Sequence, residues 1–168
     1  MILESNNLEA THDIGRRLGA ALIVGDVVAL VGPLGAGKTA LVRGIAEGAG
    51  VPDSREVNSP TFVIVNEYEA PPPGRSESPQ HGPGPGSAAL RLYHIDTYRL
   101  RNWTDLDALG FDEMLAQGAA LIEWADRVEP LLPEDRLTIT LEPIDDTRRR
   151  FHCHAGGPRS QALLAALR

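Results

Sequence analysis

The fold of this chain is decided by residues 27–39, which read VVALVGPLGAGKT. The first five are apolar, and Val27, Val28 and Val31 are β-branched, which is typical of a strand buried on both faces. Residues 32–39 match the pattern G-x-x-x-x-G-K-T, and residues 40–46 continue as a helix-forming run. Because a P-loop requires a strand, a glycine-rich loop and a helix in this order, the stretch predicts a P-loop.

The residue types of this loop suit a phosphate. Glycines at 35 and 37 let the backbone point its N–H groups inward, and the helix that follows adds the positive end of its dipole. Lys38 supplies a mobile charge for the β- and γ-phosphates, and the Thr39 hydroxyl suits Mg²⁺. No Asn-Lys-x-Asp pattern for reading guanine occurs, which favours ATP. We therefore expect ATP and Mg²⁺ at a site that includes Gly35, Ala36, Gly37, Lys38, Thr39 and Ala40.

Composition favours one globular domain over residues 1–168. Apolar residues make up 42% of the chain and charged residues 23%, as in ordinary globular proteins. No apolar run approaches membrane-spanning length and the start lacks a targeting pattern, so we expect a cytoplasmic protein with no membrane contact. The net charge of −7 argues against independent binding to nucleic acid, which needs a basic surface. Action on RNA would then be indirect, through a partner.

The single cysteine, Cys153, excludes an internal disulfide. It lies between His152 and His154, an arrangement that resembles a set of metal ligands. On a strand, however, the two histidines would face one side and the cysteine the other. We therefore expect no three-ligand metal site there.

Periodicity predicts alternating helices and strands along the rest of the chain. The segment 70–88 differs from them, because it holds six of the thirteen prolines and almost no apolar side chains. We expect it to be a flexible insert that joins two strands. The expected helices are 7–22, 40–46, a short one ending near 109, 111–117 and 158–168, and the expected strands are 27–31, 62–68, 90–96, 119–124, 136–141 and 150–154.

Two acids end predicted strands and could complete a hydrolytic site. A P-loop site needs a carboxylate on the Mg²⁺ side and a group that positions the attacking water. The strand before Glu123 is apolar throughout, whereas the strand before Asp96 carries Arg91 and His94 and is expected to be less enclosed. We therefore assign Glu123 to the metal side and Asp96 to water orientation or general-base work, although the residues alone also allow the reverse.

Thr61 lies between the P-loop helix and the next predicted strand. In P-loop proteins this position often senses the γ-phosphate and moves on hydrolysis. We therefore expect Thr61 to act in the catalytic cycle, together with Asp96 and Lys38.

The motifs together resemble a known family. In chain order they are G-x-L-G-A-G-K-T at 32–39, S-P-T-F at 59–62, H-x-D-x-Y-R-L at 94–100, D-L-x-x-L-G-F-D-E at 105–113 and I-E-W at 122–124. This set resembles the TsaE (YjeE) family, the bacterial ATPases of tRNA threonylcarbamoyladenosine synthesis. The resemblance implies an α/β fold, the three-layer P-loop NTPase sandwich, with a mainly parallel central sheet and antiparallel strands at its sides. It also implies a weak ATPase that works with TsaB and TsaD proteins. In that case the chain would contact tRNA only indirectly, through these partners.

Carried over by position, the resemblance assigns further roles. It places Trp124 beside the metal-side acid and Arg148 at the nucleotide, with Arg149, one residue later, as the alternative. Pro33 replaces the family's usual Asp, and Ala40 replaces a hydroxyl residue after Lys-Thr. The insert is also longer than usual. None of these departures removes a catalytic residue.

Two other functions fit a P-loop. The first is a small-molecule kinase, although such enzymes usually add an arginine-bearing lid, and the only long insert carries one arginine, Arg75. The second is an interaction module that depends on a bound nucleotide without hydrolysing it. Release of phosphate from ATP without an acceptor would exclude the kinase. A loss of partner-stimulated ATP turnover in Asp96→Ala would exclude the interaction module.

Overall fold

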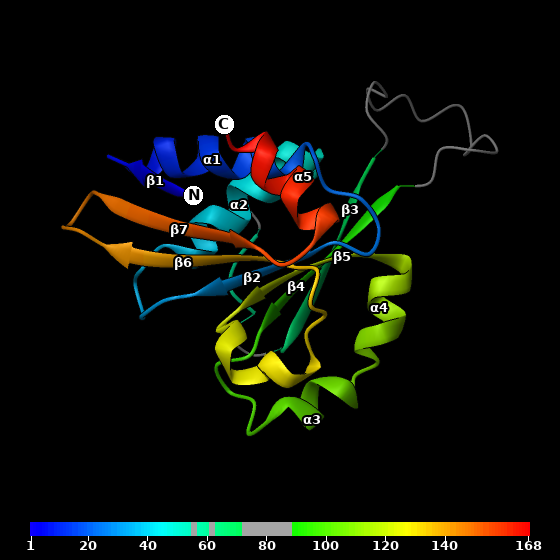
Figure 1. The fold of residues 1–168 in the computed structure, drawn as a ribbon. Coiled ribbons are helices and arrows are strands. Elements are labelled where there is room, and N and C mark those ends of the chain that lie inside the picture. The colour runs from blue at the N-terminus through cyan, green and yellow to red at the C-terminus, as the bar shows by residue number, and fades with distance from the viewer. Residues whose placement is uncertain (55–56, 61–62, 72–88) are drawn as a thin grey trace.

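A seven-stranded sheet with helices on both faces forms the protein (Figure 1). The computed structural model describes residues 1–54, 57–60, 63–71 and 89–168. The strand order is β1-β7-β6-β2-β5-β4-β3. Strands β6, β2, β5 and β4 pair in parallel, while β1, β7 and β3 are antiparallel to their neighbours. The predicted three-layer α/β sandwich, mainly parallel at its centre, is confirmed.

The bounds of most elements lie close to those that the sequence patterns predict. The strands are β1 (Ile2–Ser5), β2 (Val27–Val31), β3 (Val65–Ala70), β4 (Leu90–Asp96), β5 (Gly118–Glu123), β6 (Leu137–Pro143) and β7 (Arg149–Ala155). The helices are α1 (Leu8–Gly19), α2 (Lys38–Ala49), α3 (Trp103–Asp107), α4 (Phe111–Gln117) and α5 (Pro158–Ala166), with a 3₁₀ segment η2 (Ala125–Leu131).

Two apolar cores hold the layers together. On one face α1, α2 and α5 pack against residues such as Leu30, Leu92 and Ile139. On the other face α3, α4 and η2 cover residues such as Ala29 and Ile122 (Figure 1). Because β2 and β5 bury both faces, they carry the continuous apolar runs that mark central parallel strands.

Helix α2 is held unusually close to α1. A Cβ atom added at Gly19 of α1 would lie 1.9 Å from the carbonyl oxygen of Ile45, and one added at Gly48 of α2 would lie 2.0 Å from that of Arg16. Only glycine permits this approach of two helix backbones. The packing fixes the helix whose first residues are Lys38 and Thr39.

The structure corrects one sequence-based expectation and bears out another. The strand predicted over 62–68 begins later, at Val65, and its neighbours Val63 and Ile64 form a bend. The strand before Asp96 is the less enclosed of the two, as predicted, because Arg91 is exposed and both ends of β4 are half-buried, whereas every residue of β5 is buried. Strand β3 pairs with β4 from Ala70 opposite Leu90, so the insert joins two adjacent strands as predicted. The expected flexibility of 70–88 falls almost wholly on residues outside the described part of the chain.

Candidate active site at the P-loop

The P-loop connects β2 to α2. Gly35 and Gly37 have φ angles of +77° and +101°, which lie in the left-handed region that favours glycine. Gly37 is the N-cap of α2, so the first amides of this helix face the same space as those of the loop. A Cβ atom at Gly35 would have no atom within 4 Å. The loop therefore provides an open cradle of backbone donors, as an anion requires.

The ammonium group of Lys38 is held by its own loop. Nζ donates hydrogen bonds to the carbonyl oxygens of Gly32 at 2.7 Å and Pro33 at 2.9 Å. It also lies 3.8 Å from the centroid of the Trp124 ring, a cation–π contact. Burial lowers the pKa of Lys38, while the nearby charges of Glu123 and Asp96 act in the opposite direction. To bind a phosphate, the Lys38 ammonium group must therefore give up its hydrogen bonds to these two carbonyl oxygens.

Glu123 ends β5 beside the P-loop helix. Its Oε1 atom accepts hydrogen bonds from the Thr39 hydroxyl at 2.8 Å and from Nε2 of His94 at 2.9 Å. The residue is only 3% exposed. A buried carboxylate needs such partners, because its desolvation is costly. The hydroxyl and the carboxylate supply the oxygen donors that a hard cation such as Mg²⁺ prefers.

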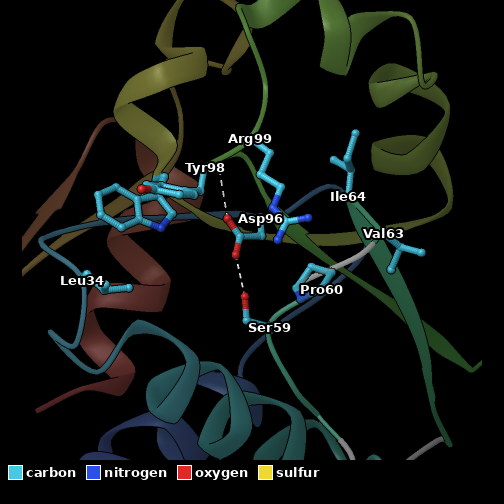
Figure 2. A pocket seen from close by; sticks show the side chains of 9 residues that line it. Leu34, Ser59, Pro60, Val63, Ile64, Asp96, Tyr98 and Arg99 are labelled. Atoms are coloured by element: carbon cyan, nitrogen blue, oxygen red, sulfur yellow. Dashed lines mark hydrogen bonds between the residues drawn. The ribbon is translucent and has the colours of Figure 1, made fainter.

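Asp96 ends β4, directly opposite Glu123 in the register of the two parallel strands. Figure 2 shows its carboxylate between Ser59 and the backbone of Tyr98. The Ser59 hydroxyl donates to Oδ2 at 2.5 Å, and the amide of Tyr98 donates to Oδ1 at 2.9 Å. Because both oxygens accept a bond, the orientation of the carboxylate is fixed. Unlike Glu123, Asp96 is half-buried.

Trp124 turns the chain sharply after Glu123. Its φ of +59° makes it the one non-glycine residue with positive φ in the described part of the chain. The buried Thr97 hydroxyl lies 2.9 Å from the carbonyl oxygen of Glu123 and 2.7 Å from that of Trp124. The ring of Tyr98 contacts the indole, with centroids 5.0 Å apart. A strained backbone that is held in place next to charged groups is typical of a functional site.

Two cavities meet at Asp96. A cavity of about 280 Å³ is lined by the P-loop together with Asp96 and Glu123. A second cavity, of about 370 Å³, lies beyond Asp96 and includes Pro60, Val63 and Ile64 in its lining (Figure 2). Both share four lining residues, Leu34, Ser59, Asp96 and Trp124.

The P-loop cavity thus brings together most of the residues expected from the sequence. Its lining includes Gly35, Ala36, Gly37, Lys38, Thr39, Ala40, Asp96, Glu123 and Trp124. Their assigned roles in binding and catalysis stay predictions. Thr61 lies outside the described residues, so its role also stays a prediction.

The two candidate arginines are placed differently. Arg148 is bound to Asp145 within the turn between β6 and β7, with Nε at 2.7 Å from Oδ2. Arg149 lies nearer the loop, because its Nε would be 3.8 Å from a Cβ atom on Gly37. Arg149, the alternative, is thus nearer to the P-loop, and its guanidinium also donates to the carbonyl oxygens of Asp145 and Arg148 in the same turn. The role of either arginine at a nucleotide stays a prediction.

The metal interpretation of the cysteine segment finds no support. On β7 Cys153 is buried, whereas His152 and His154 are exposed. Within the described ranges, no group of three or more His, Cys, Asp or Glu side chains could hold a metal ion by itself. Nor is any helix of this part of the chain long and apolar enough to cross a membrane.

Sequence reasoning missed three side chains at the site: His94, Ser59 and Thr97. For His94 a signal was present, since the spacing His-x-Asp places it on the same face of β4 as Asp96. The hydrogen bonds of Ser59 and Thr97 reach across 37 and 26 residues. Such contacts leave no local pattern in the sequence.

The sheet order, the loop and the two strand-end acids define a protein of the P-loop NTPase class. The model of the family "Threonylcarbamoyl adenosine biosynthesis protein TsaE" matches residues 5–151. The chain belongs to the TsaE family, which acts in tRNA threonylcarbamoyladenosine biosynthesis.

Individual relatives agree with this assignment. The chain is 38% identical to the tRNA threonylcarbamoyladenosine biosynthesis protein TsaE of Bacillus subtilis, over 96% of this chain and 89% of that protein. It is 36% identical to the Treponema pallidum protein of the same name, over 88% of this chain and 95% of that protein. The crystal structure of Bacillus subtilis YdiB superposes with a TM-score of 0.72 at 32% identity, covering 99% of this chain and 93% of that one.

Proposed function

We propose that this protein binds ATP with Mg²⁺ and hydrolyses it in support of threonylcarbamoyl transfer to tRNA. One observation carries the proposal: Asp96 and Glu123 lie side by side at the ends of β4 and β5, and Glu123 is bound to the first turn of the P-loop helix through Thr39. Phosphoryl transfer by P-loop proteins depends on positioning and on charge stabilisation, which such an arrangement can provide.

The chain's own residues divide the work of binding. Amides of the loop at Gly35 and Gly37 bind the phosphates, and Lys38 exchanges two carbonyl partners for phosphate oxygens. Thr39 and Glu123 would hold Mg²⁺ through their hydroxyl and carboxylate oxygens. When bound, Mg²⁺ neutralises charge on the β- and γ-phosphates. Ala40 contributes its backbone amide only, and Arg149 adds a positive charge at the loop's edge.

Asp96 is the group that acts on water. Its two oxygens are held by Ser59 and Tyr98, and the half-buried side chain lines the P-loop cavity. From this position it can accept a hydrogen bond, and then a proton, from a water molecule that attacks the γ-phosphate. Glu123 is already bound to Thr39 and His94, which favours the metal side for that acid.

TsaB- and TsaD-like proteins are the partners in this proposal, and tRNA is contacted through them. The net charge of −7 supports an indirect role, because a protein that binds tRNA by itself needs a basic surface. Since tRNA and ATP meet in the cytoplasm, we place the reaction there.

Phosphate release by the purified chain tests hydrolysis directly. With ATP and Mg²⁺ and no acceptor, we expect slow release that stops when EDTA is added. A panel of nucleosides tests the kinase alternative, for which the 370 Å³ cavity beyond Asp96 would be the acceptor site. Transfer of labelled γ-phosphate to any acceptor, faster than release to water, would contradict the proposal.

A further inference from the structure

The side chain of His94 is a polar group in the core beside the candidate site. It lies in the middle of β4 and is completely buried, at 0% exposure. Side chains alternate along a strand, so His94 and Asp96 point to the same face of the sheet. Asp96 is opposite Glu123 in register, and His94 reaches the same glutamate diagonally from two residues earlier.

The hydrogen bonding of this ring is one-sided. Nε2 lies 2.9 Å from Oε1 of Glu123, while Nδ1 has no hydrogen-bond partner among the described residues. An ionised carboxylate can only accept, so Nε2 carries the proton and donates. A histidine kept for packing would need no charged partner, and an aliphatic residue would fill the same space without leaving a polar atom unpaired. The only side-chain hydrogen bond of His94 in this part of the chain is the one to Glu123.

The bond restricts what Glu123 can do. Oε1 accepts from both His94 and Thr39, at 2.9 Å and 2.8 Å, whereas Oε2 accepts no hydrogen bond within the described ranges. One oxygen is therefore fixed between β4 and the P-loop helix. The other keeps its lone pairs for a cation or its water shell.

We infer that His94 is a positioning residue, which orients the Glu123 carboxylate toward Mg²⁺ through the Nε2–Oε1 hydrogen bond. This inference rests on the proposed binding of Mg²⁺ and ATP. Groups that orient a metal-side ligand typically change metal affinity or activity by about 10–100-fold when they are removed.

Equilibrium binding of the ATP analogue AMP-PNP, in Mg²⁺ and in EDTA, measures this role without catalysis. For His94→Leu we expect the affinity for AMP-PNP in EDTA to stay within about twofold of the wild-type value. The increase in affinity on adding Mg²⁺ should be smaller than in the wild type by about tenfold or more. His94→Gln places an amide N–H near the position of Nε2 and should restore most of that gain. His94→Asn is too short to reach Glu123 and should behave like the leucine variant.

Leu92→Val is the matched control for burial. Leu92 is fully buried on the same face of β4, two residues before His94, and has no part in the site. We expect it to lower the melting temperature while leaving the Mg²⁺-dependent gain unchanged. A double variant with Glu123→Gln tests the route, because His94→Leu should add almost nothing once the carboxylate is gone.

Three results would overturn the inference. The first is that folded His94→Leu keeps the full increase in AMP-PNP affinity that Mg²⁺ gives the wild type. The second is that His94→Gln and His94→Asn show the same Mg²⁺-dependent increase in affinity. The third is that the double variant loses affinity by the product of the two single-variant losses. If the wild-type chain binds no AMP-PNP under either condition, the proposed function fails and this inference fails with it. Mg²⁺-dependent binding without any hydrolysis would contradict the proposed ATPase alone, and the comparison of variants would still decide the role of His94.

Discussion

Thr39 and Glu123 are 84 residues apart in the chain, and a hydrogen bond of 2.8 Å joins the hydroxyl of the first to the carboxylate of the second. This bond ties the first turn of α2 to the end of β5. It links the half of the site that holds phosphates to the half that carries the acids. The two halves line one cavity, and Asp96 is part of its lining.

Replacing Asp96 by Asn should separate hydrolysis from binding. The amide keeps the size of the side chain but cannot take a proton from water, so the turnover number should fall by about 10²–10⁴-fold. Binding of ATP, measured by calorimetry, should change little. Arg101→Ala is a suitable control, since Arg101 is exposed near Asp96 in the chain and pairs with Asp105 at the surface. Equal loss of binding and turnover in Asp96→Asn would contradict the assigned role.

Trp124 should report the movement of Lys38. In the structure the ammonium lies 3.8 Å from the indole centroid and binds the carbonyls of Gly32 and Pro33. Binding to phosphates must draw it away from these partners, which changes the surroundings of the indole. We expect ATP to alter the fluorescence of the Trp103→Phe variant, in which Trp124 is the only tryptophan. Unaltered fluorescence at saturating ATP would show that Lys38 keeps its present position.

Gly19→Ala tests the close packing of α1 against α2. The added methyl group would lie 1.9 Å from the carbonyl oxygen of Ile45, so the two helices must move apart. We expect the free energy of unfolding, measured by urea titration, to fall by about 1–3 kcal/mol. Leu8→Ala, on the exposed side of the same helix, should cost much less. An equal fall in the free energy of unfolding for Gly19→Ala and Leu8→Ala would contradict the tight packing of α1 against α2.

The thiol of Cys153 should react slowly in the native protein. Burial raises its pKa to about 11, so at pH 8 the reactive thiolate is on the order of one part in a thousand. Iodoacetamide should label the folded chain far more slowly than the chain in urea, where the pKa returns to about 8.5. Because the folded pKa is the higher one, the contribution of the thiol to stability is lost as pH rises from about 8.5 toward 11. Equally fast labelling in both states would contradict this burial.

Local patterns in the sequence were sufficient for the central elements. The apolar run of β2, the loop after it and the apolar strand before Glu123 are all strong local signals, and all three lie where the sequence predicts them. Strand β1 was missed, because four residues at an edge become a strand only by pairing with β7, almost 150 residues later. Segment η2 was missed for a similar reason: it follows the sharp turn at Trp124, which no local pattern predicts.

The site was predictable in its residue types and less so in its contacts. The P-loop and both acids were found from spacing and strand ends. Strand β4 is less enclosed than β5, as predicted, because of Arg91 and the two half-buried ends, but His94 was wrongly taken as a sign of exposure and is in fact buried against Glu123. Arg148 and Arg149 could not be ranked from the sequence, since the turn between β6 and β7 decides which one faces the loop.

We propose that this chain hydrolyses ATP in support of its tRNA-modifying partners. The most direct measurement is phosphate release from ATP by the purified chain, alone and with TsaB and TsaD proteins, for the wild type and for Asp96→Asn. We predict slow release alone, faster release with the partners, and loss of both rates in the variant. An absence of stimulation, or a stimulated rate that Asp96→Asn leaves unchanged, would contradict the account.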